Sequence, residues 1–299
     1  MQVKDLMFRP GLMKGQRILI TGGGTGLGRV MAEAFVMLGA EVAIAGRRSA
    51  VLEATAAQIV DCHGGTVLPV MCDITNADDV DAALETVWNK LGPLTGLVNN
   101  AAGNFISRTE DLSPRGFDAI ANIVFRGSFL MTAACGKRWI KEGNRASVIS
   151  ILTTWIRNGS PFVVPSAMSK AGVAAMTKSL AVEWGSKGIR FNAIAPGPFP
   201  TEGMEKRLNP GGNNSSFDGT VRNPIGRVGR MPELANLAIY LLHPGSEYLN
   251  GEVIAIDGGE YLATGGNFSE LRHWTDEQWR EARDSIRQTD NKDKAGRNV

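Results

Sequence analysis

The strongest chemical pattern in the chain is a glycine-rich turn that follows a short apolar run at residues 17–21. Gly22, Gly26 and Gly28 have the spacing Gly-x3-Gly-x-Gly, and an apolar helical pattern begins directly after them. Small residues let a backbone approach a pyrophosphate, and the N–H groups at a helix N-terminus meet its charge. Glycines also serve ordinary tight turns, but a turn between a strand and a helix, ahead of a second strand, favours a dinucleotide site.

The end of the second predicted strand indicates which dinucleotide binds. Sheets that bind NAD usually place an acidic residue about 20 positions after the glycines, where it binds the ribose 2′-hydroxyl. The sequence Gly46-Arg47-Arg48 stands there instead. A guanidinium suits a 2′-phosphate, so NADP(H) is the expected cofactor and Arg47 an expected ligand of it. The alternative is a solvated arginine at a helix start, which fits Arg48 better than Arg47.

Alternating strand and helix patterns must position these residues. Short runs of buried-type residues predict strands at residues 17–21, 41–45, 66–72, 96–99, 147–150, 190–195 and 252–256. Helical patterns between them include residues 77–91, 114–141, 169–186 and 232–242. This alternation predicts an α/β fold, a Rossmann-type doubly wound sheet of seven mainly parallel strands with helices on both faces. A helical bundle, the alternative, does not account for the β-branched runs and their glycine borders.

The alternation is continuous, so residues 1–262 are predicted to form a single NADP-binding domain. Residues 197–230 are rich in Pro, Gly, Asn and Ser and too long for an ordinary connection, so we expect a lid loop there. Residues 263–299 are expected to form a C-terminal extension with one helix. That helix begins at Thr275, with Gln278 three residues later as a capping box.

Five short motifs lie in order along residues 15–260: Thr21-Gly22-x3-Gly26-x-Gly28, Cys72-Asp73-Ile74, Asn99-Asn100-Ala101-Ala102-Gly103, Pro196-Gly197-Pro198 and Asp257-Gly258-Gly259. Together they resemble the motifs of the short-chain dehydrogenase/reductase family. The resemblance implies cofactor contacts along the glycine-rich turn, from Gly22, Gly24, Thr25, Gly26, Leu27 and Gly28. It also implies contacts with the adenine, the cofactor ribose and the nicotinamide amide, made respectively by Asp73 and Ile74, by Asn100 and Ala101, and by Pro196, Gly197 and Phe199.

The residues that carry the chemistry of this family are only partly present. The family has a tyrosine four positions before a lysine and a serine thirteen positions before the tyrosine; this chain has Ser166, Lys170 and Thr153 at those positions. A further family asparagine corresponds to Val124. Reduction of a ketone makes an alkoxide that must be protonated by an acid such as the tyrosine, and a serine hydroxyl is much weaker. Reduction of a conjugated C=C instead collects charge on a carbonyl as an enolate, which hydrogen-bond donors can hold.

Four further segments, residues 99–109, 162–166 with Lys170, 207–210 and 266–272, resemble the 2,4-dienoyl-CoA reductases. This narrower resemblance implies that Asn104 binds the thioester oxygen and that Ser166 and Lys170 complete the catalytic set. It also implies that Arg207 meets the CoA phosphates and that Phe105 and Ser113 contact the substrate. The alternatives are a turn-forming role for Asn104 and a solvated position on the lid for Arg207.

One position departs from the narrower pattern. Trp155 stands eleven residues before Ser166, where the mitochondrial-type enzymes carry a second oxygen-binding tyrosine. An indole N–H is a donor only, so Trp155 could hold an enolate but could not protonate an alkoxide. The other interpretation makes Trp155 a wall of the pocket, and both stay open. We count Trp155 among the candidate catalytic residues.

These observations predict an NADPH-dependent reductase that converts a 2,4-dienoyl-CoA to an enoyl-CoA in unsaturated fatty-acid β-oxidation. One alternative is another enoyl-thioester reductase of the same family. A second alternative, from a different class, is a catalytically inactive NADPH-binding protein, which the lost tyrosine could signal. The family resemblance implies a homotetramer built through the helices at residues 114–141 and 169–186.

Composition excludes several other classes of protein. The 299 residues carry 32 basic and 30 acidic side chains, a formal charge of +2, so no nucleic-acid partner is expected. The three cysteines and three histidines show no metal-binding spacing, so no metal is expected. No apolar run approaches the ~18 residues that span a bilayer, and residues 1–16 lack the apolar core of a signal peptide. The expected location is the cytoplasm, with no stable membrane insertion.

Overall fold

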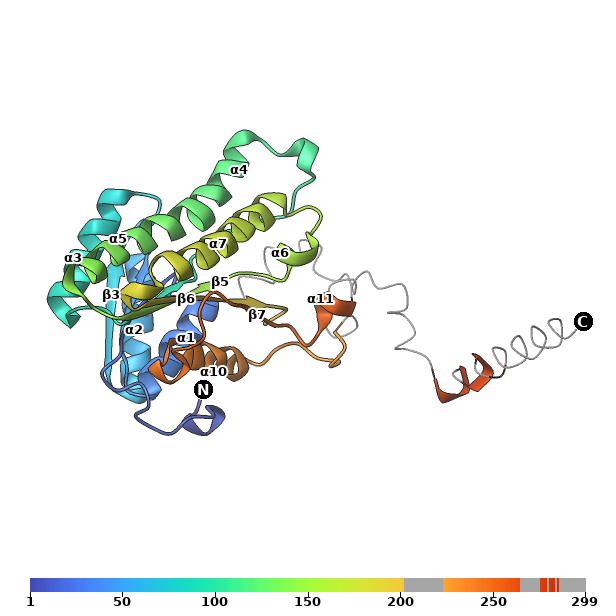
Figure 1. Cartoon of the computed structure of the whole chain (residues 1–299), viewed down its shortest axis with the longest axis horizontal. Coiled ribbons are helices and arrows are strands. Elements are labelled where there is room, and N and C mark those ends of the chain that lie inside the picture. Colours follow the sequence, from blue (N-terminus) through green and yellow to red (C-terminus); the bar gives the residue numbers. More distant parts are fainter. Residues whose placement is uncertain (202–222, 264–274, 279, 283, 285–299) are drawn as a thin grey trace, which may run out of the picture.

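The computed structural model describes residues 1–201, 223–263, 275–278, 280–282 and 284 (Figure 1). Seven strands form one sheet in the order β3-β2-β1-β4-β5-β6-β7, and every pairing in it is parallel. This confirms the predicted α/β fold. The strands are β1 (Arg17–Thr21), β2 (Glu41–Gly46), β3 (Thr66–Met71), β4 (Gly96–Asn99), β5 (Ala146–Ile151), β6 (Ile189–Pro196) and β7 (Val253–Ile256).

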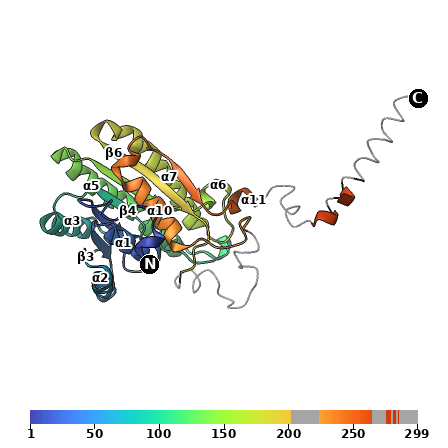
Figure 2. The same cartoon turned by 90° about the horizontal axis from the view of Figure 1, so that it is seen from below.

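Helices cover both faces of the sheet. The described helices are α1 (Gly26–Met37), α2 (Ser49–His63), α3 (Ala77–Leu91), α4 (Pro114–Ala121), α5 (Gly127–Glu142), α6 (Trp155–Asn158), α7 (Val164–Glu183), α10 (Met231–Leu242) and α11 (Glu260–Ala263), together with the short turns η1 (Val3–Asp5), η2 (Thr109–Asp111), η3 (Asn122–Arg126), η4 (Gly185–Lys187) and η6 (Pro244–Ser246). Figures 1 and 2 show α1, α2 and α10 on one face and α3, α5 and α7 on the other.

Each face of the sheet has its own hydrophobic core. Phe35 of α1 and Leu234 of α10 lie at the centre of one core and are fully buried. Trp139 of α5 and Leu84 of α3 lie in the other. Strands covered on both faces are apolar on both sides, which explains the continuous apolar runs in the sequence.

Two helix predictions are corrected by the structure. The helix predicted from residue 169 begins at Val164, five residues earlier, with Pro165 in its first turn, a position that proline favours. The helix predicted over residues 114–141 contains a π-helical turn, η3, and extends to Glu142. Phe125 in this turn packs directly on Gly172 of α7, where an added Cβ would lie 2.6 Å from the ring.

Two predicted segments lie partly outside the described residues. Residues 202–222 of the expected lid loop, with Arg207, and residues 264–274 are not described. The predicted capping box is confirmed, because the Thr275 backbone N–H donates to Gln278 Oε1 at 2.8 Å and the Gln278 N–H donates to Thr275 Oγ1 at 3.3 Å.

One described helix, Pro114–Glu142, is long and apolar enough to cross a membrane by length and composition, with a mean hydropathy of 1.3 over its most apolar window. Half of that window is buried inside the fold. Its second half, α5, packs against α3 and α7 on one face of the sheet. We therefore interpret it as a core helix.

Candidate active site

The strand order reverses between β1 and β4, so the turns after these two strands flank a crevice site of the kind that binds dinucleotides. The glycine-rich turn after β1 is built around close backbone approaches. Gly22 has a φ of 66°, and a Cβ there would lie 3.0 Å from Ala101 Cα, at the end of β4. A Cβ on Gly28 would lie 2.6 Å from Asn100 Nδ2 and closer still to the Gly22 carbonyl oxygen. The turn therefore closes tightly on β4 only because these residues are glycines.

The first turn of α1 fits an anionic group. Its N-cap Thr25 makes no side-chain capping hydrogen bond, and the first turn holds no acidic residue. At Gly26, with a φ of 54°, the nearest described atom to an added Cβ is a Thr201 methyl at 3.8 Å, so no described residue packs closely against that side of the turn. Gly24 is different, since it packs on Leu52 of α2. The N–H groups of Gly26, Leu27 and Gly28 could thus hold a pyrophosphate.

Asn100 and Ala101 brace the turn from the neighbouring strand. Both of their backbone N–H groups donate to Thr21 Oγ1 at 3.0 Å. Asn100 Nδ2 also donates to the carbonyl oxygens of Thr21 at 2.9 Å and Gly22 at 3.2 Å. The structure therefore gives Asn100 a bracing role that the sequence did not indicate, and its contact with the ribose stays a prediction.

The ends of β2 and β3 carry the residues predicted near the adenosine. Arg47 follows β2 and is exposed. Asp73 accepts hydrogen bonds from the Thr75 backbone N–H at 3.0 Å and the Thr75 hydroxyl at 2.8 Å. The Thr75 backbone N–H lowers the pKa of the Asp73 carboxyl, and the Thr75 hydroxyl and the Arg47 guanidinium lower it further. Ile74 is buried against Gly127 of α5.

Ser166 and Lys170 lie one turn apart in the first part of α7, and both are buried. Lys170 Nζ donates to the carbonyl oxygen of Ile151, at the end of β5. Burial lowers the pKa of the Lys170 amine to about 8. The lysine is therefore held rigidly at the carboxyl end of the sheet, beside the strand that leads into Thr153 and Trp155.

The loop that carries Asn104 contacts the loop that follows α6, the one-turn helix that begins at Trp155. The Ser107 N–H, on the Asn104 loop, donates to the carbonyl oxygen of Phe162, on the loop after α6, at 2.9 Å. Phe162 is the only non-glycine residue with positive φ in the described part of the chain, at 65°. Asn104 Oδ1 accepts from the Phe105 N–H at 3.0 Å, and an amide engaged in this way presents its NH2 group as a donor. Trp155 is half-buried at the start of α6.

The structure describes two of the three predicted substrate residues. Phe105 is 37% exposed and lies over the start of α4, with its ring near Gly116. Ser113 is the N-cap of α4, and its Oγ accepts from the Gly116 N–H at 3.1 Å, which is a structural role. Substrate contacts of both residues stay predictions. Arg207 lies outside the described residues.

The end of β6 carries the segment predicted near the nicotinamide. Gly197 follows Pro196 and packs on Asp257, where an added Cβ would lie 2.6 Å from Asp257 Cβ. Phe199 is buried beneath Gly229. A pocket of about 160 Å³ lies here, and its lining includes Phe199, Gly229 and Asp257.

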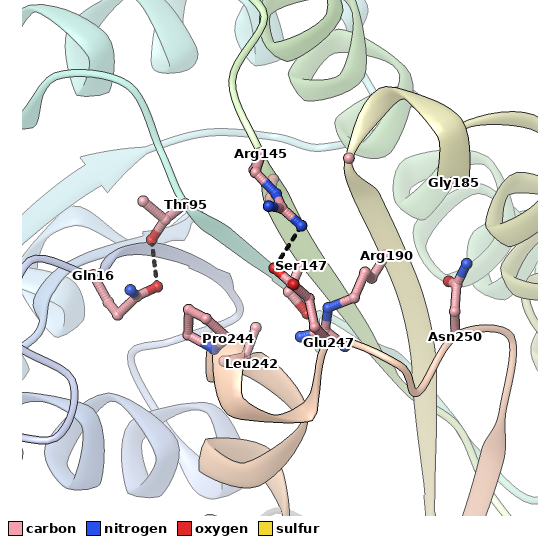
Figure 3. Close-up of a pocket in the computed structure, with 12 residues that line it drawn as sticks. Gln16, Thr95, Arg145, Ser147, Gly185, Arg190, Leu242, Pro244, Glu247 and Asn250 are labelled. Carbon is pink, nitrogen blue, oxygen red and sulfur yellow. Dashed lines mark hydrogen bonds and ion pairs between the residues drawn. The ribbon is translucent and has the colours of Figure 1, made fainter.

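A second, larger pocket of about 310 Å³ lies at the opposite ends of the strands (Figure 3). Arg145 Nη2 pairs with Glu247 Oε1 at 2.5 Å on its wall. Arg190 is buried and donates to the carbonyl oxygens of Leu241 at 2.8 Å and Leu249 at 2.9 Å. Both arginines thus serve the fold, and this pocket is separate from the candidate active site.

Comparison with known proteins agrees with this arrangement. The family model described as Enoyl-(Acyl carrier protein) reductase matches residues 22–260. A probable 2,4-dienoyl-CoA reductase of Caenorhabditis elegans, (3E)-enoyl-CoA-producing, is 43% identical over 98% of this chain and 96% of its own. A peroxisomal 2,4-dienoyl-CoA reductase of Mus musculus is 33% identical over 89% of this chain and 90% of its own.

A solved structure also has a similar fold. The crystal structure of a short-chain dehydrogenase from Bacillus anthracis superposes with a TM-score of 0.76 at 40% identity and covers 85% of this chain and 100% of its own. With the glycine-rich turn, the uncapped first turn of α1 and the buried lysine, these similarities support a nicotinamide-dinucleotide oxidoreductase. The chain belongs to the short-chain dehydrogenase/reductase family, and within that family it resembles the 2,4-dienoyl-CoA reductases.

Proposed function

We propose that this protein uses NADPH to reduce the conjugated C=C of a 2,4-dienoyl-CoA to an enoyl-CoA, a step in the β-oxidation of unsaturated fatty acids. The observation that carries the proposal is the buried pair on α7, in which Ser166 replaces the family's acidic tyrosine while Lys170 is kept and held by the Ile151 carbonyl. A site with this pair can bind the cofactor but lacks the phenol that ketone reduction needs. The relatives named as 2,4-dienoyl-CoA reductases support the same substrate class.

The rest of the chemistry follows from charge on the substrate oxygen. Bound NADPH would supply a hydride to the far end of the conjugated system. Asn104 Nδ2 and Trp155 Nε1 would donate to the thioester oxygen as negative charge collects there, which is where donors lower a barrier most. The Lys170 ammonium would bind the ribose hydroxyls and add positive potential, and water would protonate the carbon. The alternative is that Trp155 only forms a wall of the pocket, and the substitution Trp155→Phe distinguishes the two roles.

The preference for NADPH over NADH rests on Arg47. It follows β2, where an NAD-binding sheet would carry an acid, and its exposed side chain carries a guanidinium that suits a 2′-phosphate. The Asp73 carboxylate accepts two hydrogen bonds from Thr75 at Oδ1, and no ion pair with Arg47 is recorded among the described residues. This arrangement favours the phosphorylated cofactor.

The acyl-CoA partner is proposed from Phe105, Ser113 and Arg207, as in the resemblance above. Arg207→Ala should raise KM for CoA thioesters and spare a truncated thioester that lacks the nucleotide. Equal effects on both substrates would remove Arg207 from the CoA site.

Assembly as a homotetramer is proposed from the family resemblance, and exposed apolar side chains on the helices that cover one face support self-association. Phe125 and Phe129 are 49% and 53% exposed, and Val182 of α7 is 85% exposed. Burial of such side chains between subunits would be favourable, and light scattering on the purified protein measures the outcome. A cytoplasmic location also stays a proposal, since several of the relatives are named as peroxisomal; microscopy of a tagged chain tests it.

The deciding experiment measures oxidation of NADPH in three separate reactions. One contains a 2,4-dienoyl-CoA, one contains a 2-enoyl thioester, and the third contains no acyl substrate. Rapid turnover with the dienoyl-CoA is the expected result. Turnover with the mono-enoyl thioester alone would identify a different enoyl-thioester reductase. Tight NADPH binding without turnover would identify an inactive binding protein and contradict the proposal.

A further inference from the structure

Arg157 is a long side chain on the same helical turn as Trp155, and it reaches across to the other end of the chain. Its Nη1 donates to the hydroxyl of Tyr261 at 2.8 Å, and its Nη2 donates to the carbonyl oxygen of Val253, at the start of β7, at 2.9 Å. Its Cζ also lies 4.7 Å from the centre of the Tyr261 ring. One guanidinium thus joins α6 to both β7 and α11, and α6 and α11 lie side by side in Figures 1 and 2.

The segment that carries Trp155 needs such an anchor. Helix α6 has only four residues, Trp155–Asn158. A helix of one turn has no stability of its own, so contacts with the rest of the fold must set its position. The strand that leads into it is tied to the sheet by the Leu152 N–H, which donates to the Ile194 carbonyl oxygen at 2.7 Å.

The anchor is itself connected to the nicotinamide end of the site. The Tyr261 N–H donates to Asp257 Oδ2 at 2.9 Å, and Asp257 Oδ1 accepts from the Gly259 N–H at 2.9 Å. Asp257 in turn packs against Gly197, at the end of β6. Arg157, Tyr261 and Asp257 therefore form a continuous series of contacts from α6 to the loop predicted beside the nicotinamide.

We propose that Arg157 and Tyr261 are a positioning pair, which fixes the indole of Trp155 relative to the nicotinamide loop. The inference rests on the proposed function, because that function makes the Trp155 N–H a donor to the substrate oxygen. Neither Arg157 nor Tyr261 is proposed to contact the substrate. The pair acts by positioning Trp155, because a displacement of a donor by about 1 Å from the reacting oxygen can lower the reaction rate about 10²-fold.

The test uses two variants that each remove one half of the contact. Arg157→Met removes the charge and the donors but keeps an unbranched side chain, and Tyr261→Phe removes only the hydroxyl. We expect kcat for the dienoyl-CoA to fall about tenfold to 10²-fold, while KM and the affinity for NADPH stay within about twofold. Arg157→Lys, which keeps a charge over the ring, should recover part of kcat.

A second readout does not depend on activity. Incorporation of 5-fluorotryptophan labels all six tryptophans, and the Trp155→Phe variant identifies the Trp155 resonance in the fluorine spectrum. In both Arg157→Met and Tyr261→Phe that resonance should shift or broaden, while those of the other tryptophans stay in place. If Arg157→Met does not fold, Tyr261→Phe decides the outcome.

The matched control is Arg138→Met, on α5. Arg138 also stacks on an aromatic ring, with its Cζ 5.6 Å from the centre of Trp88, and it pairs with Asp81 at 3.2 Å. The Arg138→Met variant should leave kcat and the Trp155 resonance unchanged. An unshifted Trp155 resonance with unchanged kcat in the Arg157 and Tyr261 variants would overturn the proposal, whatever their thermal stability. If the parent protein fails to reduce the dienoyl-CoA, the proposed function is wrong, and the fluorine spectra still decide whether the pair positions Trp155.

Discussion

The substitution Gly28→Ala tests the phosphate-binding role of the glycine-rich turn, because a single methyl group must fit where the structure leaves no room. The added Cβ would lie 2.6 Å from Asn100 Nδ2 and closer to the Gly22 carbonyl oxygen, whereas real Cβ contacts below 3.0 Å essentially do not occur. The backbone oxygen cannot rotate away as a flexible side chain would. The Gly22 backbone and the first turn of α1 must therefore separate by about 0.6 Å before this contact reaches 3.0 Å.

Two opposing terms set the loss of stability. Insertion of a methyl group into a packed site costs about 1–3 kcal/mol, and alanine is more favourable than glycine inside a helix by about 1 kcal/mol. We expect a net loss of about 1 kcal/mol. Cofactor binding should suffer more, because a charge-assisted hydrogen bond is worth about 1.5–3 kcal/mol. Loss of one such bond from the α1 N–H groups raises the Kd of NADPH about tenfold to 10²-fold.

The assay pairs thermal unfolding with a direct titration of NADPH. Gly136→Ala in α5 is the control, because its Cβ would lie 2.5 Å from Trp184 Cη2 in a part of the fold away from the glycine-rich turn. Both variants should lose stability, but only Gly28→Ala should lose affinity for NADPH. If Gly28→Ala binds NADPH as tightly as the parent, the turn does not hold the pyrophosphate and the reasoning is wrong.

Four other substitutions probe the remaining parts of the site. Arg47→Ala should weaken binding of NADPH by about 1.5–3 kcal/mol and leave NADH unchanged, and equal parent affinities for the two cofactors would contradict the assignment. Trp155→Phe should lower kcat by about 10²-fold with little change in KM if the N–H is an oxyanion donor, and an unchanged kcat would make the residue a wall. The pKa of Lys170, lowered by burial to about 8, predicts that kcat/KM falls as the pH rises through 8; Lys170→Met should lose most activity and show no such step. Glu233→Gln should reduce the loss of folding stability in acid, because the Arg227 hydrogen bond holds the pKa of Glu233 at about 2, below its unfolded value. The stability that this carboxylate contributes is present above about pH 4.3 and is lost as the pH falls towards 2. Identical acid-unfolding profiles for the variant and the parent would refute this prediction.

Local patterns were sufficient for much of this protein. The apolar runs and their glycine borders predicted all seven strands within one or two residues, because a buried parallel strand needs apolar side chains on both faces. The turn at Gly22–Gly28 and the substitution of Ser166 for the family tyrosine could also be read directly, since each depends on residue type and spacing within a short segment. Those features were enough to indicate the family and the class of reaction.

Features that depend on distant contacts required the tertiary structure. The π-helical turn at Asn122–Arg126 packs against α7, and no periodicity within the helix indicates that neighbour. The carbonyl that binds Lys170 lies 19 residues earlier in the chain, and Asn100 proved to be a brace for a turn 78 residues away. Arg157 gave no signal in the sequence, because its partner Tyr261 is 104 residues distant. A short-range pattern indicates which side chains of a segment are buried. The partner of a given side chain is set only by the tertiary structure, because the sheet brings together residues that are far apart in the sequence.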